Sequence, residues 1–279
     1  MTFKVPMPEL PEVESIVREL LDAQPSLLGR KITGVNIVWE GVVSGVLCAD
    51  FQRQLAGAGF VSVARQGKYL LFGLEQKVGP QAKSRFLIIH LRMSGRLFLV
   101  SQSDAIARHT RLSLVLDHGL ALRFDDPRKF GRVWLVDDPG EVIAGLGPDA
   151  LTMRAEDFSA RLARHRRRLK ALLLDQAFVA GIGNIYADES LHRAGLNPCA
   201  NSGDLSAADV LRLHGAIISV LQEAVAAKGA NIYGVFKAGN FQVSVYAREG
   251  EACPVCGTAI VKTRIGQRGT HYCPRCQVL

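Results

Sequence analysis

Residues 178–198 read FVAGIGNIYADESLHRAGLNP, and they predict how the second half of the chain folds. Gly181 and Gly183 interrupt the helical pattern that precedes them, and Asn184 begins a new one that ends near Gly195. A glycine with a proline shortly after it, here Pro198, is a typical signal for the end of a helix. Two helices joined by a glycine turn occur in DNA-binding proteins, although plain helical bundles contain the same arrangement.

Both flanks of this stretch carry helical periodicity. AEDFSARLARHRRRLKALLLDQ (155–176) and SAADVLRLHGAIISVLQEAVAAKG (206–229) repeat apolar residues at intervals of three and four. The preceding segment DDPGEVIAGLGPDAL (137–151) is rich in Pro, Gly and Asp, which indicates a domain boundary. We therefore expect a linker over 138–152 and a helical domain over 153–245.

Residues 31–136, upstream of this boundary, predict β-structure. YLLFGLE (69–75), RFLIIHLRMSGRLFLV (85–100), RLSLVLD (111–117) and LALRFDD (120–126) are strand-like apolar runs. No helical crossover separates the runs, which favours an antiparallel sandwich over a parallel sheet.

Two local features frame these strands. A hairpin turn is expected at His118–Gly119. An amphipathic helix precedes the strands, with Pro11 in its first turn and an apolar stripe that includes Val13 and Leu20.

Four of the six cysteines form a metal-binding pattern. Cys253-Pro-Val-Cys256 and Cys273-Pro-Arg-Cys276 are C-x2-C pairs separated by sixteen residues. Each pair can place two thiolates on one side of a tight turn, and two pairs complete a tetrahedral site for one Zn²⁺. Disulfide bonds are the alternative, which an intracellular setting and the short spacing within each pair disfavour. Because four thiolates leave no open coordination position, the predicted zinc ribbon (246–279) is structural.

The charge of the chain favours a polyanionic partner, nucleic acid first. The 279 residues carry a net charge of +8, and RLARHRRRLK (161–170) holds six Arg or Lys in ten residues. Basic residues recur in KTRIGQR (262–268), although a solvated surface explains either run taken alone. No apolar run approaches the ~18 residues of a membrane span, so we expect a soluble, intracellular protein without a membrane partner.

Six motifs, in order along the chain, resemble one family: formamidopyrimidine-DNA glycosylase and its relative endonuclease VIII. They are PELPEVE (8–14), GKYL (67–70), HLRMSG (90–95), DPRKFG (126–131), GIGNIYADE (181–189) and QRGTHYCPRCQ (267–277). The resemblance covers nearly the whole chain and implies an α+β multidomain fold. Its parts are an N-terminal antiparallel β-sandwich with flanking helices (7–137), a helix–two-turns–helix domain (153–245) and a C-terminal zinc ribbon (246–279).

The resemblance implies an enzyme that removes oxidised bases from DNA and then cuts the strand at the abasic site. Pro8 matches the N-terminal proline whose amine attacks C1′ of the damaged nucleotide. An α-amine with a pKa of ~8 is unprotonated in roughly a tenth of molecules at pH 7, far more than a lysine with a pKa of ~10.4. A secondary amine also yields a charged iminium, which draws electrons during elimination. Without its flanking residues, Pro8 would be only a proline that leads a helix.

Three further residues match the proton chemistry of the family. Glu9 matches the general acid that protonates the opening sugar ring. Lys68 matches the lysine assigned to proton transfer during β-elimination. Arg268 matches the finger arginine that grips phosphate and assists δ-elimination, a role that suits the bidentate guanidinium. Glu12 matches a second carboxylate near the site, and a helix N-terminal charge explains it equally well.

The resemblance also implies DNA contacts. A flipped base leaves a hole in the duplex that must be filled, and Met93, Arg128 and Phe130 match the filling triad. Core packing is the alternative for Met93 and Phe130. Three more residues match family positions that contact the DNA backbone: His109, Arg166 and Asn184.

The segment GANIYGVFKAGNFQVSVYAR (229–248) departs from the family pattern. Typical formamidopyrimidine-DNA glycosylases have a longer Gly/Ser/Thr-rich segment there, which caps a flipped oxidised purine. The short, more apolar segment puts an 8-oxoguanine cap in question. Formamidopyrimidines, oxidised pyrimidines and hydantoin products are therefore all candidate substrates, and the last two would mean specificity like that of endonuclease VIII.

The position of Pro8 sets a condition on the chemistry. If residues MTFKVP (1–6) remain in place, Pro8 is a tertiary amide whose nitrogen cannot form an iminium. We expect translation to start at Met7 and Met7 to be removed, and an intact terminus at Met1 or Thr2 in the native protein would contradict this.

These expectations combine into a base-excision repair DNA glycosylase with AP lyase activity. Its partner is double-stranded DNA with oxidised or abasic sites, and we expect a monomer in the cytoplasm, at the nucleoid of a bacterial cell. A non-catalytic damaged-DNA-binding protein is the alternative if the N-terminal extension is retained. The presence of Glu9, Lys68 and Arg268 together favours the enzyme, because DNA binding alone needs no proton chemistry.

Overall fold

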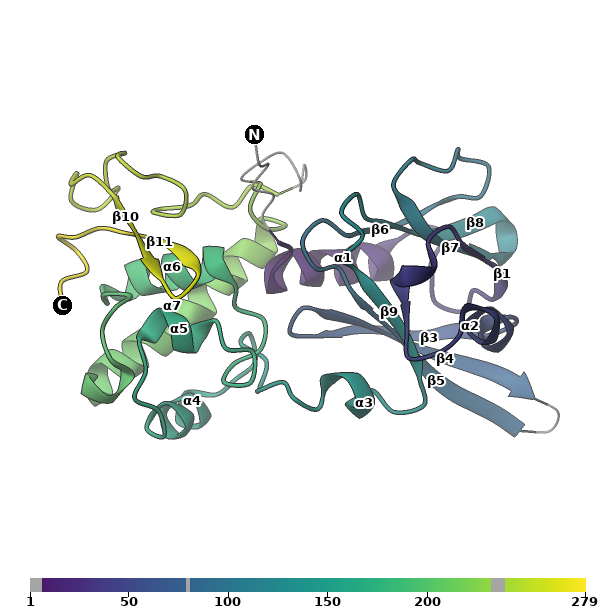
Figure 1. The fold of residues 1–279 in the computed structure, drawn as a ribbon, viewed down its shortest axis with the longest axis horizontal. Coiled ribbons are helices and arrows are strands. Elements are labelled where there is room, and N and C mark those ends of the chain that lie inside the picture. Colours follow the sequence, from purple (N-terminus) through teal and green to yellow (C-terminus); the bar gives the residue numbers. More distant parts are fainter. Residues whose placement is uncertain (1–6, 79–80, 232–238) are drawn as a thin grey trace. The chain divides into compact units, whose positions relative to one another are not determined.

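The computed structural model describes residues 7–78, 81–231 and 239–279. The chain divides into two compact units (Figure 1). Of the described residues, the first contains Met7, Pro8 and Val13–Ala144, and the second contains Glu9–Glu12 and the residues from Gly145 to Leu279. Within the described ranges, no helix is both long and apolar enough to pass through a membrane.

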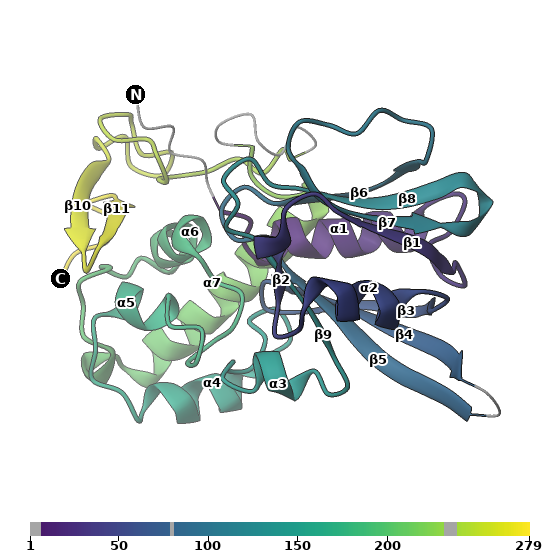
Figure 2. The same cartoon turned by 45° about the vertical axis from the view of Figure 1, so that its right-hand side comes forward.

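The first unit is built on two β-sheets, which Figure 2 shows as separate layers. One sheet has the strand order β2-β9-β5-β4-β3 and the other the order β1-β7-β8-β6. The strand bounds are β1 Ile32–Ile37, β2 Val43–Ser44, β3 Gly59–Gln66, β4 Tyr69–Val78, β5 Gln81–His90, β6 Arg96–Ser101, β7 Thr110–Leu116, β8 Leu120–Asp125 and β9 Arg132–Val136. Side chains from both sheets and from helix α1 (Leu10–Asp22) share one hydrophobic core. The predicted sandwich is confirmed.

The run 85–100 contributes to both layers of this sandwich. Its first residues form the end of strand β5 in the five-stranded sheet. The chain turns at residues 91–95, and the last residues of the run belong to strand β6 in the four-stranded sheet. The predicted turn at His118–Gly119 is confirmed, because both residues have positive φ (56° and 73°) between β7 and β8. Such angles suit the tight turn of a hairpin.

Two details of the sandwich differ from the prediction. Strand β2 pairs with β9 in parallel, so the sheet is not purely antiparallel. Helix α2 (Cys48–Leu55) lies between β2 and β3, where only strands were expected. Phe51 and Leu55 are the residues that α2 buries, and two apolar anchors in eight residues are too weak a periodic signal for a sequence-based prediction.

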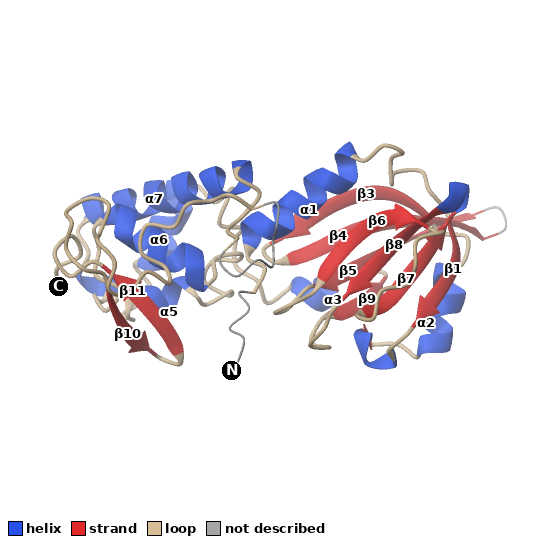
Figure 3. Cartoon of the chain, turned by 90° about the horizontal axis from the view of Figure 1, so that it is seen from above, coloured by secondary structure: helices blue, strands red, loops and turns tan. Residues whose placement is uncertain are grey.

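The second unit consists of helices followed by a small β-hairpin (Figure 3). Its helices are α4 Ala155–Leu162, α5 Leu169–Leu173, α6 Asn184–Ala194 and α7 Ala207–Ala226, and the short helix α3 Gly140–Ile143 precedes them in the first unit. The hairpin consists of β10 Val261–Ile265 and β11 Arg268–Tyr272. The part of the chain that the structure describes also contains three 3-10 turns: η1 Glu40–Val42, η2 Asp117–Gly119 and η3 Ser202–Asp204.

Helix α6 begins and ends where the sequence predicts. Asn184 is its first residue, and Gly195 ends it in the left-handed conformation with φ 64°. Helix α7 begins with a capping box, because Ser206 and Asp209 exchange hydrogen bonds at its N-terminus. The apolar faces of these helices form the core of the second unit, and Leu10 from the first turn of α1 is part of that core.

The helical periodicity of 155–176 does not correspond to one continuous helix. Two helices, α4 and α5, occupy this range, and residues 163–168 between them are not helical. The Leu169 backbone N–H donates to the Ala200 carbonyl, and the Ser202 N–H donates to the Arg167 carbonyl. These tertiary hydrogen bonds replace the helical ones, and repulsion between like charges spaced four apart, such as Arg164 and Arg168, also disfavours a helix here.

Candidate active site

Glu9 lies at the N-terminus of helix α6. Its Oε1 accepts a hydrogen bond from the Ile185 N–H at 3.0 Å, and its Oε2 accepts one from the Tyr186 N–H at 3.3 Å. The first N–H groups of a helix have no intrahelical partner and carry partial positive charge. The carboxylate next to Pro8 is therefore held in a fixed position, and its negative charge is stabilised there. Pro8 itself is buried.

The glycines of the GIG sequence (181–183) make this position possible. A Cβ on Gly183 would lie 2.2 Å from Cδ of Glu9, and a Cβ on Gly181 would lie 2.4 Å from Cδ1 of Leu10. Gly181 also has φ 109°, and its carbonyl accepts the Leu10 N–H at 3.1 Å. Any larger residue at these two positions would displace the chain that carries Glu9.

Glu12 is a buried carboxyl beside Glu9. Its Oε2 accepts the Glu9 N–H at 2.9 Å, and its Oε1 accepts the Tyr186 hydroxyl at 2.6 Å and the Ala230 N–H at 2.9 Å. Burial and the nearby Glu9 carboxylate raise the pKa of Glu12 to about 7. Gly229, with φ 88°, leaves room for Glu12, because a Cβ there would lie 2.5 Å from Oε1.

Lys68 is a buried residue of the first unit, at the turn between β3 and β4. The strand register places Tyr69 opposite His90, and the two rings meet edge to face at 4.4 Å. Burial, followed by the charges of Arg92 and Lys68, lowers the pKa of His90 to about 3. Nδ1 of this neutral ring accepts the Arg92 N–H at 3.0 Å, which leaves the ring proton on Nε2.

Asp126 organises the loop that carries Arg128 and Phe130. Its carboxylate, which is fully buried, accepts backbone N–H groups from Arg128 at 3.2 Å and from Phe130 and Gly131 at 2.7 Å each. The side chains of Arg128 and Phe130 are exposed, and the guanidinium lies 5.0 Å from the centre of the Phe130 ring. An exposed, hydrogen-bonded loop with an aromatic tip is suited to enter a gap in a base stack.

Met93 is linked to the same loop. It lies half-buried in the turn between β5 and β6, and the hydroxyl of the next residue, Ser94, donates to Oδ1 of Asp126. The three residues predicted to fill the hole in DNA therefore lie on two loops that share one buried carboxylate. His109 is exposed, and its carbonyl accepts the Asp126 N–H at 2.8 Å, which adds a third segment to the cluster.

The basic run 161–170 divides into residues with different environments. Arg161 donates to the carbonyls of Phe178 and Ala177, and Arg167 pairs with Asp175. Lys170 is fully buried and cannot contact DNA from the surface. Arg164, Arg166 and Arg168 have exposed side chains.

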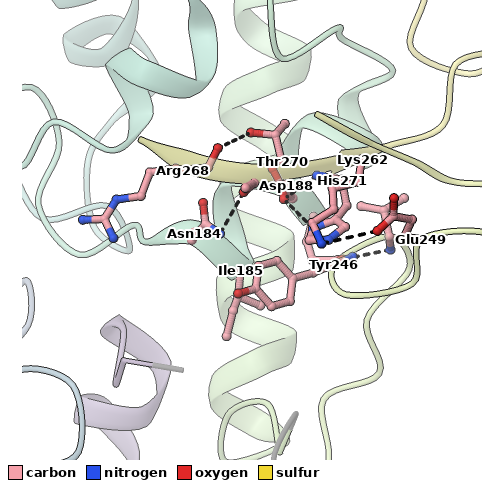
Figure 4. Close-up of polar contacts among 12 residues, drawn as sticks. Asn184, Ile185, Asp188, Tyr246, Glu249, Lys262, Arg268, Thr270 and His271 are labelled. Carbon is pink, nitrogen blue, oxygen red and sulfur yellow. Dashed lines mark hydrogen bonds and ion pairs between the residues drawn. The ribbon is translucent and has the colours of Figure 1, made fainter. Parts of the chain in front are cut away.

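Arg268 and the residue that Asn184 contacts are neighbours on strand β11. Arg268 is the first residue of β11 and is exposed, and Figure 4 shows its guanidinium extending away from Asp188 and His271. The Asn184 amide nitrogen donates to the carbonyl of Gly269, the next residue, at 3.0 Å. In the second unit, Arg268, Asn184 and Glu9 are thus all held around the N-terminal end of helix α6.

The four cysteines of the C-x2-C pairs come together as predicted. Their Sγ atoms all lie within 4.8 Å of one another, with Cys253–Cys276 at 3.9 Å and Cys256–Cys273 at 3.4 Å. Zn–S bonds of ~2.3 Å in a tetrahedron separate the sulfurs by about 3.8 Å, so the set fits one zinc ion. Four thiolates fill the coordination shell, which makes the zinc structural.

Two residues connect this zinc finger to helix α6. His192 Nε2 lies 3.4 Å from Sγ of Cys253. Gln277 donates to the Leu196 carbonyl at 2.9 Å and accepts the Cys273 N–H at 2.9 Å. The finger is thus fixed to the end of α6 by buried polar contacts.

Several residues of these clusters were not predicted from the sequence. Asp126 and Ser94 lie inside quoted motifs, and a carboxylate followed by a Pro-Arg-Lys turn is a signal for a loop anchor. Lys170 and Asp188 carry no such signal, because nothing in the sequence pairs residues on separate helices. The short segment 229–248 contains residues 232–238, which lie outside the described residues.

The fold and these clusters define a class. The first unit has two sheets and an exposed Arg–Phe loop. The second unit has a carboxylate at a helix N-terminus and a four-cysteine finger with an exposed arginine. These features are typical of an enzyme that binds DNA and contains zinc.

Family models match along the chain in the same order. The formamidopyrimidine-DNA glycosylase N-terminal domain matches residues 7–133, its H2TH domain matches 145–234, and the zinc finger found in FPG and IleRS matches 250–278. The chain belongs to the formamidopyrimidine-DNA glycosylase family.

Relatives with this family name are similar to the chain over nearly their full length. Formamidopyrimidine-DNA glycosylase of Pelotomaculum thermopropionicum is 41% identical, over 97% of this chain and 99% of the relative. That of Enterococcus faecalis is 40% identical, over 98% of each chain. A structure of Lactococcus lactis FPG with DNA containing FAPY-dG is 31% identical with a TM-score of 0.85, and covers 97% of this chain and all of the other. A structure of MutM with DNA containing carbocyclic 8-oxo-G is 32% identical with a TM-score of 0.86, over 98% and 100% of the two chains.

Proposed function

We propose that the protein is a base-excision repair DNA glycosylase with AP lyase activity, which removes formamidopyrimidines through a Schiff base on Pro8. The observation that carries this proposal is the position of Glu9. A carboxylate next to the nucleophile is fixed by two N–H groups of helix α6, and a third contact to Glu12 fixes its backbone. A DNA-binding protein without catalysis has no need of this arrangement.

The first step joins Pro8 to the damaged nucleotide. The free amine of Pro8 attacks C1′, the bond from C1′ to the base breaks, and the base leaves with a proton from solvent. The proton that the attacking nitrogen still carries passes to the Glu9 carboxylate, and Glu9 delivers it to O4′ as the sugar ring opens, which leaves a charged iminium between Pro8 and C1′. The helix terminus that binds the carboxylate keeps it oriented throughout the proton transfer.

Elimination then cuts the strand. The iminium acidifies the C2′ proton, and its loss breaks the bond between C3′ and its oxygen. A second elimination removes the C4′ proton and breaks the bond between C5′ and its oxygen. Water then hydrolyses the iminium, which releases the sugar remnant and restores the Pro8 amine. Lys68 is the residue proposed for proton transfer in the first elimination, and Arg268 is the residue proposed to hold phosphate and assist the second.

DNA binding is assigned to the exposed groups of both units. Met93, Arg128 and Phe130 would fill the gap that the flipped base leaves, and the shared Asp126 keeps their two loops in register. Contacts to the phosphate backbone are proposed for three residues: His109, Arg166 and Asn184. The zinc holds the finger that presents Arg268, and it takes no part in the reaction.

We propose the domain limits 7–137, 153–245 and 246–279, with a linker over 138–152. The protein would act as a monomer on double-stranded DNA at the bacterial nucleoid. The active form begins at Pro8, since only a free amine can form the iminium.

Excision assays on a panel of lesions test this function. Duplexes with a formamidopyrimidine, 8-oxoguanine, an oxidised pyrimidine or a hydantoin are incubated with the protein that begins at Pro8, and base release is measured apart from strand cleavage. We expect the formamidopyrimidine to be excised. The short segment 229–248 favours weak excision of 8-oxoguanine, and preferential excision of oxidised pyrimidines would instead support specificity like that of endonuclease VIII.

Substitution of Glu9 sharpens the test. Glu9→Gln should lower the rate of base release by about 10²–10⁴. Glu19→Gln, which changes an exposed carboxylate on helix α1, is the matched control and should retain the wild-type rate. Wild-type excision by Glu9→Gln, or tight binding of every lesion without any excision, would overturn the proposal.

A further inference from the structure

Lys170 ends the basic run that the sequence assigned to a surface, yet it is one of the most buried side chains of the second unit. Its Nζ lies 2.6 Å from Oδ1 of Asp188, and both side chains are 0% exposed. A buried ion pair costs desolvation on both sides and is a weak source of stability. The presence of the Lys170–Asp188 pair is therefore better explained by the groups that it holds in place than by a gain in stability.

The pair lies against strand β11 at the residue that follows Arg268. Lys170 Nζ donates to the Gly269 carbonyl at 2.8 Å, and the Asn184 amide donates to the same carbonyl at 3.0 Å. Two residues further along β11, the His271 N–H donates to Oδ2 of Asp188 at 2.9 Å (Figure 4). Alternate residues of β11 are thus anchored by helices α5 and α6 on one side of the strand.

Charge also connects the pair to the candidate catalytic groups of the second unit. Burial lowers the pKa of Lys170, while the Asp188 carboxylate opposes that shift. Glu9 raises the pKa of Lys170 and Arg268 lowers it, so both charges act on the ammonium group. Lys170 therefore lies in the electrostatic environment of both groups without reaching the surface.

We propose that the Lys170–Asp188 ion pair is a positioning device for Arg268. It fixes strand β11 to helix α6 through the carbonyl of Gly269 and the N–H of His271, and so determines where the guanidinium meets a DNA phosphate. Lys170 itself contacts no phosphate. The inference rests on the proposed function, because only there does Arg268 bind phosphate.

A double-mutant cycle tests the inference. Lys170→Met and Arg268→Gln are made singly and together in the full chain that begins at Pro8. Affinity for a duplex with a stable abasic-site analogue is measured at several salt concentrations, together with zinc content and thermal stability. We expect Lys170→Met to weaken binding about tenfold and to make the salt dependence shallower, with zinc retained, and to have almost no further effect once Arg268 is Gln.

Two further variants keep the test decisive. Because Lys170→Met leaves Asp188 as an uncompensated buried charge, Lys170→Met/Asp188→Asn removes both charges and keeps an oxygen for the His271 N–H. If the single variant does not fold, the cycle is run with this pair. Glu249→Gln breaks the exposed 3.3 Å ion pair with Lys262 on the same hairpin and should bind DNA as the wild type does.

The outcomes separate the two claims. An equal loss of affinity from Lys170→Met in both backgrounds means a general structural role, and it overturns the inference alone. Unchanged affinity and salt dependence in Arg268→Gln would show that Arg268 binds no phosphate, and it would overturn the inference together with that part of the proposed function.

Discussion

Single buried carboxyl groups organise the clusters on this chain. Glu9 binds the start of helix α6, Glu12 binds Glu9 and Tyr186, and Asp126 binds four donors from two loops. Each replaces water with N–H or O–H donors, which is the condition for burying a carboxylate. The glycines beside them, such as Gly183 and Gly229, are required by the same contacts.

The raised pKa of Glu12 gives the fold a pH dependence. Its pKa is 4.5 in the unfolded reference and about 7 in the folded protein, so between these values the folded state holds a proton that the unfolded state has lost. Stability therefore falls as pH rises from ~4.5 to ~7, by about 3 kcal/mol from this group, and then levels off. Denaturant unfolding from pH 5 to pH 8 should show the wild type losing stability relative to Glu12→Gln. A difference between the two that stays constant with pH would refute the assignment.

Asp126 gives a second test at the scale of a residue. Asp126→Asn turns one acceptor oxygen into an N–H₂ donor that faces the N–H groups of its own loop, so we expect a loss of about 2 kcal/mol in stability. The same variant should fill the gap in DNA poorly, which a fluorescent base analogue opposite an abasic site reports. Asp138→Asn is the control, because Asp138 is an exposed carboxylate that accepts the Gly140 N–H. Equal effects of the two substitutions would contradict the role given to Asp126.

At the scale of elements, the run 161–170 illustrates how far the sequence can be interpreted. Its composition predicts a basic surface, and its periodicity predicts a helix, but the backbone of 167–169 forms hydrogen bonds to 200–202 instead. Periodicity carries no information about bonds between distant segments. For the same reason the sequence did not separate Lys170, which is buried, from its exposed neighbours.

The arginines of this run should differ in their effect on DNA binding. Substituting Gln for Arg164, Arg166 or Arg168 should each make the dependence of log K on log salt shallower by up to about 0.9, the value for one lost phosphate contact. Substituting Gln for Arg161 or Arg167 should leave that slope unchanged and lower stability by about 1 kcal/mol, because their guanidinium groups already bind protein acceptors. The same change of slope in both groups would refute this division.

The zinc finger depends on its metal and on the end of helix α6. Cys273→Ser should lower zinc affinity by more than ~10-fold and weaken both DNA binding and nicking, because the hairpin that carries Arg268 loses its anchor. Zinc content by atomic absorption and nicking of abasic duplex are the measurements. Cys199→Ser, at a half-buried cysteine outside the cluster, should retain both zinc and nicking. Undiminished nicking by Cys273→Ser would exclude the coupling.

At the scale of the whole molecule, the sequence predicted the architecture because each part has a local signature. Strand runs ending in Gly or Asp, a glycine turn before Asn184 and two C-x2-C pairs are short patterns with a physical cause. The sequence did not predict contacts between segments that are far apart along the chain. The Glu9–α6 contact, the Ser94–Asp126 bond and the Lys170–Asp188 pair are all of this kind.

The central claim is that the free amine of Pro8 is the nucleophile, and trapping with borohydride on abasic duplex tests it most directly. Two forms of the chain are compared: one that begins at Pro8, and one that keeps residues 1–7. A covalent adduct that peptide mapping assigns to Pro8 in the first form, and no adduct at Pro8 in the second, is the predicted result. An equal yield of adduct from the extended chain, or an adduct mapped to Lys68, would contradict the account.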